Sequence, residues 1–462
     1  MNMKNMIIRK YIISEAILLI ILTASSMMIS CKKYLDAKPN QQQAVPSTLQ
    51  DLQALLDNVL VMNRSFPGIG EAASDNYYVT VADYNALSTS QDKSLYIWQP
   101  DGVIPDGQWI SPYQVVYYAN QVLESLTQIA PVQTVQSAQI KGAALYFRAY
   151  ALFQAASVFT KPYNTQTSNT DLGLPIRLTT DFNTVSVRST NQQTYDRILT
   201  DFKQSIALLP QTSTYPSQPT KMAAYAAIAR TYLAMGQYSQ AGAYADSCIS
   251  FNPPLMDFNT LSTTSANPIA RFNKETIFYA MSGGSTLLVP SRCKIDSTLF
   301  LSYAAGDLRK SIYFKNNNNG TYAFKGNYDG SQSATIFTGL ATDEVYLIRA
   351  ECYAREGKTT NALNDLNTLL QTRWKTGTFQ PFQANDAPSA LALILSERRK
   401  ELVFRALRWT DLRRLNQEAA FAVTLKRNLG QTVYQLLPQD LQYEFLIPQE
   451  VITTSGIQQN SR

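Results

Sequence analysis

The sequence contains no histidine among its 462 residues. This absence excludes Ser-His-Asp and Cys-His catalysis, metal sites with histidine ligands and a histidine-based pH switch. Charged residues are also scarce, at 16% of the chain, and the formal net charge is +6. So small a positive excess over this length gives no reason to expect nucleic acid as a partner. With 45% hydrophobic residues, the chain still has enough apolar side chains to bury a large core.

The first 30 residues have the three-part layout of a secretory signal. Three basic residues lie in 1–10, an unbroken apolar run occupies 16–22, and small and polar residues follow. The run is short for a membrane-spanning helix and is preceded by Glu15. The layout therefore predicts a signal peptide over 1–30, with a membrane anchor or a buried helix as the alternative.

A cysteine follows this segment directly. Ser30 before Cys31 resembles the lipobox of bacterial lipoproteins, although Met28 stands where that motif usually has leucine. The resemblance implies cleavage before Cys31 and acylation of this residue, and two or more acyl chains hold a protein firmly on a membrane. The polar stretch that follows then reads as a hydrated tether over 31–45.

Little else in the sequence suggests a disulfide, a catalytic site or a metal site. Of the four cysteines, three remain once Cys31 is acylated, and an odd number cannot all pair within the chain. Cys248 and Cys352 lie in helical patterns, which favours buried apolar roles. Glu71 and Asp75 are paired carboxylates of the kind that acid-base hydrolysis needs, but nothing around them favours that over a loop role. We find no metal-ligand spacing, phosphate loop or nucleophile elbow, and predict neither an enzyme nor a cofactor.

Most of the periodic segments have the 3.6-residue spacing of helices. The segment 139–159 is apolar on most faces, which is typical of a central, buried helix. The spacing predicts helices over 48–62, 113–129, 139–159, 194–209, 221–235, 239–249, 342–356, 360–373, 388–402 and 409–417.

Two of these helix pairs share one internal register. Ala229, Tyr232, Gly236 and Ala241 have the same spacing as Ala350, Tyr353, Gly357 and Ala362. The pattern matches tetratricopeptide helix-turn-helix units, in which glycine ends the first helix and small residues let the second approach closely. A long insertion separates the two pairs along the chain. The fold expected is all-α, with tetratricopeptide-like pairs forming a helical scaffold that carries long irregular loops.

Two irregular stretches, 65–112 and 252–339, are rich in aromatic residues among Pro, Gly, Asp and Asn. Tyr and Trp combine a flat apolar face with a polar group, which suits sugar rings and peptides alike. We expect the ligand site on the surface that these stretches form, because loops on a rigid scaffold commonly carry binding residues. Packing in the scaffold is the alternative for each ring. The candidate ligand-binding residues are Trp98, Trp109, Tyr77, Tyr78, Tyr303 and Tyr322.

The densest group of charges lies at 397–414, with seven basic and three acidic residues. One interpretation is a site for an anionic ligand. The other is a charged helix whose ion pairs fix it to the scaffold. Helical spacing favours pairs of Glu401 with Arg405 and of Arg408 with Asp411.

Taken together, these segments resemble the SusD/RagB-like nutrient-binding outer-membrane lipoproteins of Bacteroidetes. The charged group and the closing Ile-Pro and Gln-Asn motifs are the most specific part of the resemblance. The segments that carry it are 31–36, 74–78, 117–123, 148–153, 172–175, 188–190 with Tyr195, 220–233, 397–414, 446–448 with Glu450, and 459–460.

The resemblance implies a single helical domain over 46–462, with loop elaborations at 65–112 and 252–339. It also implies a lipid anchor in the outer membrane, with the body facing outside, and a SusC-like TonB-dependent barrel as partner. The implied function is capture of a nutrient, most often an oligosaccharide, and its delivery to that barrel without catalysis. A peptide-handling or purely structural lid of the barrel is the alternative.

Overall fold

The computed structural model describes residues 46–64 and 66–462. The predicted signal peptide, the acylation site at Cys31 and the tether over 31–45 lie outside the described residues. Among the residues that are described, 17 segments are α-helices and the sheets have two strands each, which confirms the mainly helical fold class. None of these helices has the length and apolar character that crossing a bilayer requires.

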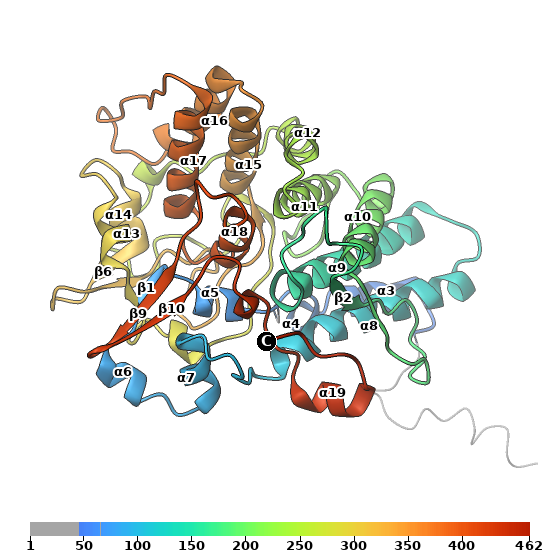
Figure 1. The fold of residues 1–462 in the computed structure, drawn as a ribbon. Helices are drawn as coiled ribbons and strands as arrows, with labels where there is room; N and C mark the ends of the chain where they lie inside the picture. Colours follow the sequence, from blue (N-terminus) through green and yellow to red (C-terminus); the bar gives the residue numbers. More distant parts are fainter. Residues whose placement is uncertain (1–45, 65) are drawn as a thin grey trace, which may run out of the picture. The chain divides into compact units, whose positions relative to one another are not determined.

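The first half of the scaffold is a row of long helices: α8 (Gly107–Ile129), α9 (Val135–Phe159), α10 (Asn191–Leu208), α11 (Lys221–Ala234) and α12 (Tyr238–Ile249). Each packs against the next one along the chain (Figure 1). The central position predicted for 139–159 is confirmed, because 20 of the 25 residues of α9 are buried. Thr134 and Thr190 are the N-cap residues of α9 and α10, and each accepts a hydrogen bond of 3.1 Å from a backbone N–H in the first turn.

The shared register of the two helix pairs is confirmed as well. The second pair is α15 (Thr342–Arg355) with α16 (Thr359–Gln371). Gly236 and Gly357 end the first helix of each pair with φ of +69° and +78°, a conformation that glycine adopts without strain. Despite the long insertion between the pairs, α12 packs directly on α15. A Cβ atom on Gly242 would lie 3.0 Å from the Cβ of Cys352, so the missing side chain permits this close approach.

The stretch 65–112 is more regular than its composition indicated. The predicted helix at 113–129 begins at Gly107 instead, and the one at 48–62 is broken into two. Threonines 80 and 89 cap two of the short helices by accepting hydrogen bonds from backbone N–H groups. The three helices within 65–112 have only five to seven residues, too few for a periodic apolar pattern to show. The elements are α3 (Leu49–Leu56), α4 (Val59–Met62), α5 (Ile69–Ala73), β1 (Tyr77–Tyr78), α6 (Val81–Asn85) and α7 (Ser90–Tyr96).

The remaining elements are short, apart from one helix near the carboxyl end. Strands β2 (Leu172–Pro175) and β3 (Arg188–Thr190) lie between α9 and α10. Between the first and second helix pairs lie β4 (Thr276–Phe278), β5 (Lys294–Ile295), α13 (Ser297–Leu301), α14 (Arg309–Tyr313), β6 (Phe314–Asn316), β7 (Tyr322–Phe324) and β8 (Leu340–Ala341). After α16 follow α17 (Ala387–Glu401), α18 (Arg408–Leu415), β9 (Leu425–Leu429), β10 (Thr432–Leu436) and α19 (Gln449–Ser455). Short 3₁₀ turns lie at Phe258–Thr260, Thr286–Leu288 and Leu441–Tyr443.

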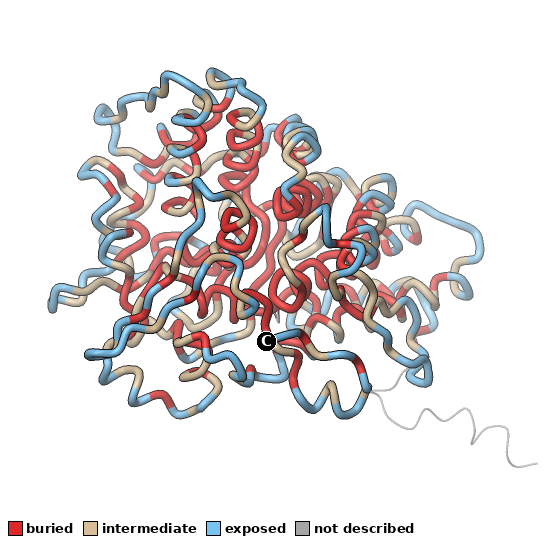
Figure 2. The backbone as a smooth tube through the Cα atoms, in the orientation of Figure 1, coloured by how far each residue is buried: buried red, intermediate tan, exposed pale blue. Residues whose placement is uncertain are grey.

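Burial follows the helical row and continues into the irregular stretches. Figure 2 shows buried backbone running from the long helices through the segments beside them. One large apolar cluster joins the helices to residues of both aromatic-rich stretches, and a smaller one lies among α15, α16 and α17. The aromatic-rich stretches are therefore packed parts of the core as well as surface. Cys248, Cys293 and Cys352 are buried and free.

Candidate functional site

A short β-ladder brings the two aromatic-rich stretches together. Strand β1 pairs antiparallel with β5, with Tyr77 opposite Ile295 and Tyr78 opposite Lys294. A second link lies nearby, where the backbone N–H of Gly283 donates to the carbonyl of Phe66 at 2.7 Å. These pairings place the stretches 65–112 and 252–339 side by side, as the expected common surface requires.

A groove of about 640 Å³ opens beside this ladder. Its walls come from the β1 segment, the start of α13, the end of α17 and strand β9 (Figure 1). This volume lies within the range typical of small-molecule sites in proteins. The residues that line it are 75–81, Tyr96, 296–298, Arg399 and 423–428. We call this cavity the groove below.

The floor of the groove is built on Arg427 of β9. Its guanidinium lies 4.4 Å, 4.8 Å and 5.2 Å from the ring centroids of Tyr96, Tyr77 and Trp98, and it also donates to the carbonyl oxygen of Ser74. A buried cation surrounded by aromatic faces is stabilised by the charge distribution of the rings. Tyr77 and Trp98, both predicted to contact ligand, are 1% and 5% exposed and act here as packing around this cation.

One wall of the groove carries a carboxylate that is paired with two guanidinium groups. Asp75 forms ion pairs with Arg408 at 2.7 Å and with Arg399 at 3.2 Å. Burial alone would raise the pKa of Asp75, but the two guanidiniums outweigh burial and lower it, so the carboxylate stays ionised. The pair predicted between Arg408 and Asp411 is wrong, since Arg408 contacts Asp75 and Asp411 pairs with other arginines.

The polar and flat surfaces that reach the groove come from Tyr78, Arg399 and the outward-facing residues of β9. Tyr78 is partly exposed and follows Tyr77, so its side chain lies on the opposite face of the strand. Along β9 the same alternation buries Arg427 and exposes Lys426 and Asn428. The groove therefore offers one aromatic face together with amide, ammonium and guanidinium donors.

Behind this wall lies Glu71, which is completely buried in α5. Its Oε1 accepts hydrogen bonds from Asn76 Nδ2 at 2.8 Å and from Ser74 Oγ at 3.3 Å, while Oε2 has no partner among the described residues. Burial raises the pKa of Glu71 to about 7, because desolvation outweighs these two hydrogen bonds. The paired carboxylates Glu71 and Asp75 thus have opposite pKa shifts, and Glu71 does not line the groove.

The other candidate rings lie elsewhere. Tyr303 is 1% exposed and donates to the carbonyl of Lys400 at 2.7 Å, so it belongs to the core. Tyr322 is half-buried and stacks on Phe300, with ring centroids 3.5 Å apart. Trp109 is 5% exposed and borders a separate hollow described below. The six predicted rings do not form one cluster, and only Tyr78 presents a partly open side chain to the groove.

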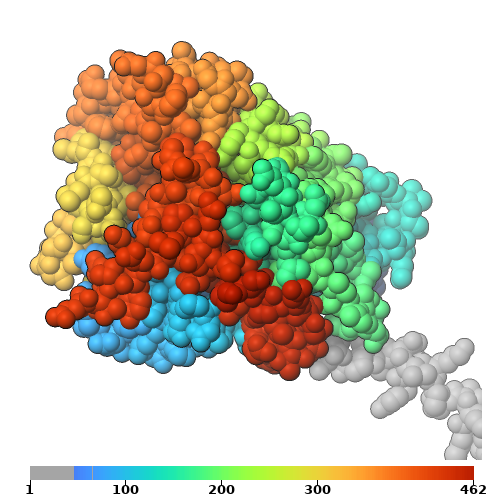
Figure 3. Space-filling model, in the orientation of Figure 1, coloured from blue at the N-terminus to red at the C-terminus, as the bar shows by residue number. Residues whose placement is uncertain are grey.

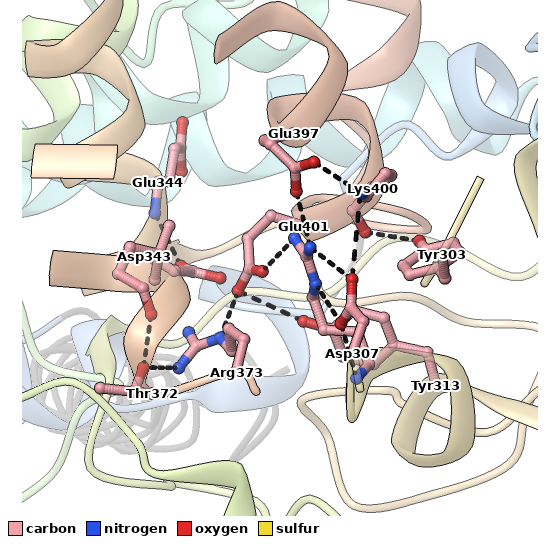
Figure 4. Close-up of polar contacts among 12 residues, drawn as sticks. Tyr303, Asp307, Tyr313, Asp343, Glu344, Thr372, Arg373, Glu397, Lys400 and Glu401 are labelled. Atoms are coloured by element: carbon pink, nitrogen blue, oxygen red, sulfur yellow. Dashed lines mark hydrogen bonds and ion pairs between the residues drawn. The ribbon is translucent and has the colours of Figure 1, made fainter. Parts of the chain in front are cut away.

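The charged group at 397–414 is mostly buried, and many of its ion pairs are with residues outside the group. Arg309 is fully buried and pairs with Asp307 and Glu397 at 2.6 Å each and with Glu401 at 3.1 Å. Figure 4 shows the acidic side chains of α17 turned toward this network and toward Arg373. Buried pairs of this kind fix a helix in place, which agrees with the scaffold interpretation.

The predicted pair of Glu401 with Arg405 is wrong. α17 ends at Glu401, and Phe404 and Ala406 have φ of +55° and +56°, so the helical spacing does not continue. Arg405 pairs with Asp343 at 3.0 Å instead.

Sequence reasoning missed Arg427, Lys426 and Asn428 because the hairpin of β9 and β10 was not predicted. The alternation of buried and exposed residues from Leu425 onward and the turn at Gly430, with φ of +66°, were the available signals.

Solved structures share this fold. A SusD superfamily protein from Bacteroides thetaiotaomicron is 22% identical, with a TM-score of 0.71 over 90% of this chain and 100% of that one. A putative sugar binding protein from Bacteroides vulgatus is 20% identical, with a TM-score of 0.71 over 90% of this chain and 99% of that one. A SusD-like carbohydrate binding protein from the same species is 17% identical, with a TM-score of 0.67 over 89% and 97%.

Family models match the sequence in two places. One, described as starch-binding associating with outer membrane, matches residues 33–233, and the model of the SusD family matches residues 309–445. No curated protein matches the sequence. The two matches together cover more than two thirds of the chain, and they show that this protein belongs to the SusD/RagB-like family that its motifs indicated.

Proposed function

We propose that this protein is a surface lipoprotein that captures an oligosaccharide in the groove and delivers it to a SusC-like TonB-dependent transporter. Family membership supports a role in binding, and two structural relatives are named as a sugar binding and a carbohydrate binding protein. The observation that carries the proposal is the groove itself, where the two aromatic-rich stretches meet beside Tyr78 and Arg399.

The chemistry of the groove suits a sugar. A pyranose has an apolar face of C–H groups, which stacks on an aromatic ring, and a rim of hydroxyls that need donors and acceptors. Tyr78 supplies the ring. Nε and Nη2 of Arg399 are held by Asn76 and Asp75, so the side chain is already ordered before ligand arrives. A donor that is fixed in advance loses less conformational entropy on binding.

The proposal includes an anchor and a partner. The signal layout and Cys31 support attachment to the outer membrane by acyl chains, with the body facing outside. The same family resemblance supports the barrel as the acceptor of the captured sugar. In this account the protein performs no catalysis, and its only task is to hold the nutrient until the transporter takes it.

A glycan array on a soluble form beginning at residue 32 tests the capture step. The strongest hit is then titrated against wild type, Tyr78→Ala and the control Tyr225→Ala, a partly exposed tyrosine on α11 that does not line the groove. We expect Tyr78→Ala to weaken binding by about 30-fold, the equivalent of about 2 kcal/mol, and the control to bind normally. Silence across the array together with tight binding to the barrel would favour the structural or peptide-handling lid.

A further inference from the structure

A second hollow, of about 520 Å³, lies between α8, the segment 175–186 that begins at the last residue of β2, and α19. We call it the trough. Figure 3 shows the dark red surface of α19 beside the green surface of the segment after β2. The trough and the groove share no lining residue, so they are separate sites on the same molecule.

One side of the trough is a series of aromatic rings. Trp109, Tyr113 and Tyr117 follow each other at intervals of four residues, which places them on one face of α8. The rings of Trp109 and Tyr113 stack with centroids 5.0 Å apart and planes at 29°. Phe182 extends the series by stacking on Tyr117 at 5.5 Å and 27°, although 83% of its own surface is exposed.

The segment that carries Phe182 is held in place by hydrogen bonds. Arg177 donates to the carbonyl oxygens of Asp181 and Thr184 and, at 3.2 Å, to the hydroxyl of Ser186. Glu124 of α8 accepts a hydrogen bond of 2.9 Å from the backbone N–H of Thr180. An exposed phenylalanine on a segment fixed in this way offers a ready aromatic face to a ligand.

The polar groups of the trough are almost all uncharged. Arg177 is the one charged side chain among the described residues that line it, and its guanidinium is occupied by the segment's own oxygens. The other polar side chains that line it carry hydroxyl or amide groups, among them Thr179, Asn183 and Thr454. Flat rings beside neutral donors and acceptors fit a neutral polyhydroxylated ring, whereas a carboxylate or sulfate would find no free counter-charge.

We propose that the trough is a second saccharide site, selective for neutral sugars and independent of the groove. The choice of a sugar as ligand rests on the proposed function, while the position of the site rests on the ring series and the uncharged lining. Two separate sites would let the protein hold a long chain at two points, which raises the effective concentration of the chain at each point.

Site-resolved fluorine NMR can test the two sites separately, because the chain has four tryptophans. Trp109 borders the trough, and Trp98 packs under the groove against Arg427. Protein labelled with 5-fluorotryptophan, its resonances assigned by single Trp→Phe replacements, is titrated with linear neutral hexasaccharides of glucose, xylose and mannose. The same titrations use uronic acid and sulfated oligosaccharides as charged probes.

We expect a neutral hexasaccharide to shift the Trp109 resonance in a saturable way, and the charged probes to leave it unchanged. Phe182→Ala should weaken this response about fivefold through loss of the exposed ring face, and folding is not at stake because that side chain is exposed. Phe251→Ala, which removes another exposed phenylalanine, serves as the control and should leave the response unchanged.

The outcomes separate this proposal from the proposed function. A shift at Trp98 alone would leave the groove as the sugar site and overturn the trough. A shift at Trp109 alone would support the trough and overturn the groove. If neither resonance moves with any probe, both assignments fail. If Phe182→Ala weakens binding to the barrel and leaves the Trp109 response intact, the exposed ring is a protein contact and the saccharide assignment is wrong.

Discussion

Replacing Glu71 by glutamine tests the electrostatics behind the groove. Glu71 is completely buried, its Oε2 has no hydrogen-bond partner among the described residues, and burial raises its pKa to about 7. The negative charge of Asp75 raises this pKa further, while the positive charge of Arg408 opposes the shift. In the folded protein at neutral pH, ionisation of Glu71 is therefore costly.

The size and sign of the effect of Glu71 on stability follow from the linkage between proton binding and folding. The folded pKa of about 7 lies above the reference value of 4.5. Between these values the folded state binds a proton that the unfolded state has released, so the free energy of unfolding falls as pH rises. At 1.36 kcal/mol per pKa unit, the loss amounts to about 3 kcal/mol once the pH exceeds 7, and it vanishes below about pH 4.5. Glutamine does not ionise, so Glu71→Gln removes this pH-dependent loss.

Urea unfolding of wild type and Glu71→Gln between pH 4 and pH 8 measures the difference. We expect the variant to gain stability relative to wild type across this range, by about 3 kcal/mol in total. Asp75→Asn is the matched control, because the pKa of Asp75 is lowered and not raised. Its contribution to stability is present in full above the unfolded pKa of 3.8, so Asp75→Asn should be less stable than wild type at every pH from 5 to 8. The deficit should shrink toward pH 8 only by the small part of the Glu71 pKa shift that the Asp75 charge causes.

A stability difference between Glu71→Gln and wild type that does not change with pH would refute this reasoning. It would mean that Glu71 ionises in the folded protein as easily as in the unfolded chain. The Asp75→Asn series guards against a general pH effect, because any change common to both variants would appear there as well.

Three further predictions concern the anchor and the buried cations. Cys31→Ser should abolish the incorporation of labelled palmitate that we expect in the wild type, and an unlabelled wild type would contradict the lipoprotein assignment. Arg427→Lys should lower the melting temperature and shift Trp98 fluorescence, because an ammonium cannot replace a planar guanidinium between three rings. An unchanged melting curve would contradict the stabilising role of the Arg427 guanidinium. Arg373→Met should cost about 3 to 5 kcal/mol, since Glu275 and Glu401 would lose a buried partner; a loss below 1 kcal/mol in chemical denaturation would show that the network relaxes.

The helical scaffold could be predicted because its segments are long enough for their period to show. The segment 139–159 is apolar on most faces and forms the buried helix α9. The spacing of residues around Gly236 and Gly357 correctly predicted two helix pairs. The packing of α12 on α15 could not be read from the chain, because it depends on where the long insertion folds. The short helices between 65 and 112 were missed for lack of a full period.

The location of the candidate site could be predicted from the sequence better than the individual residues that line it. We expected the two aromatic-rich stretches to share a surface because of their composition, and the β1–β5 ladder brings them together. Composition alone cannot say which face of a strand a ring takes, and this decides between buried Tyr77 and partly exposed Tyr78. Trp98 was assigned to a loop surface because its cationic partner, Arg427, lies more than 300 residues away in the chain.

A crystal structure of the soluble protein with its strongest glycan-array hit would test the central proposal most directly. We expect a sugar ring stacked on Tyr78 in the groove, with its hydroxyls within hydrogen-bond distance of Arg399 or of the exposed residues of β9. Sugar bound away from the groove, on the helical scaffold or in the trough alone, would contradict it.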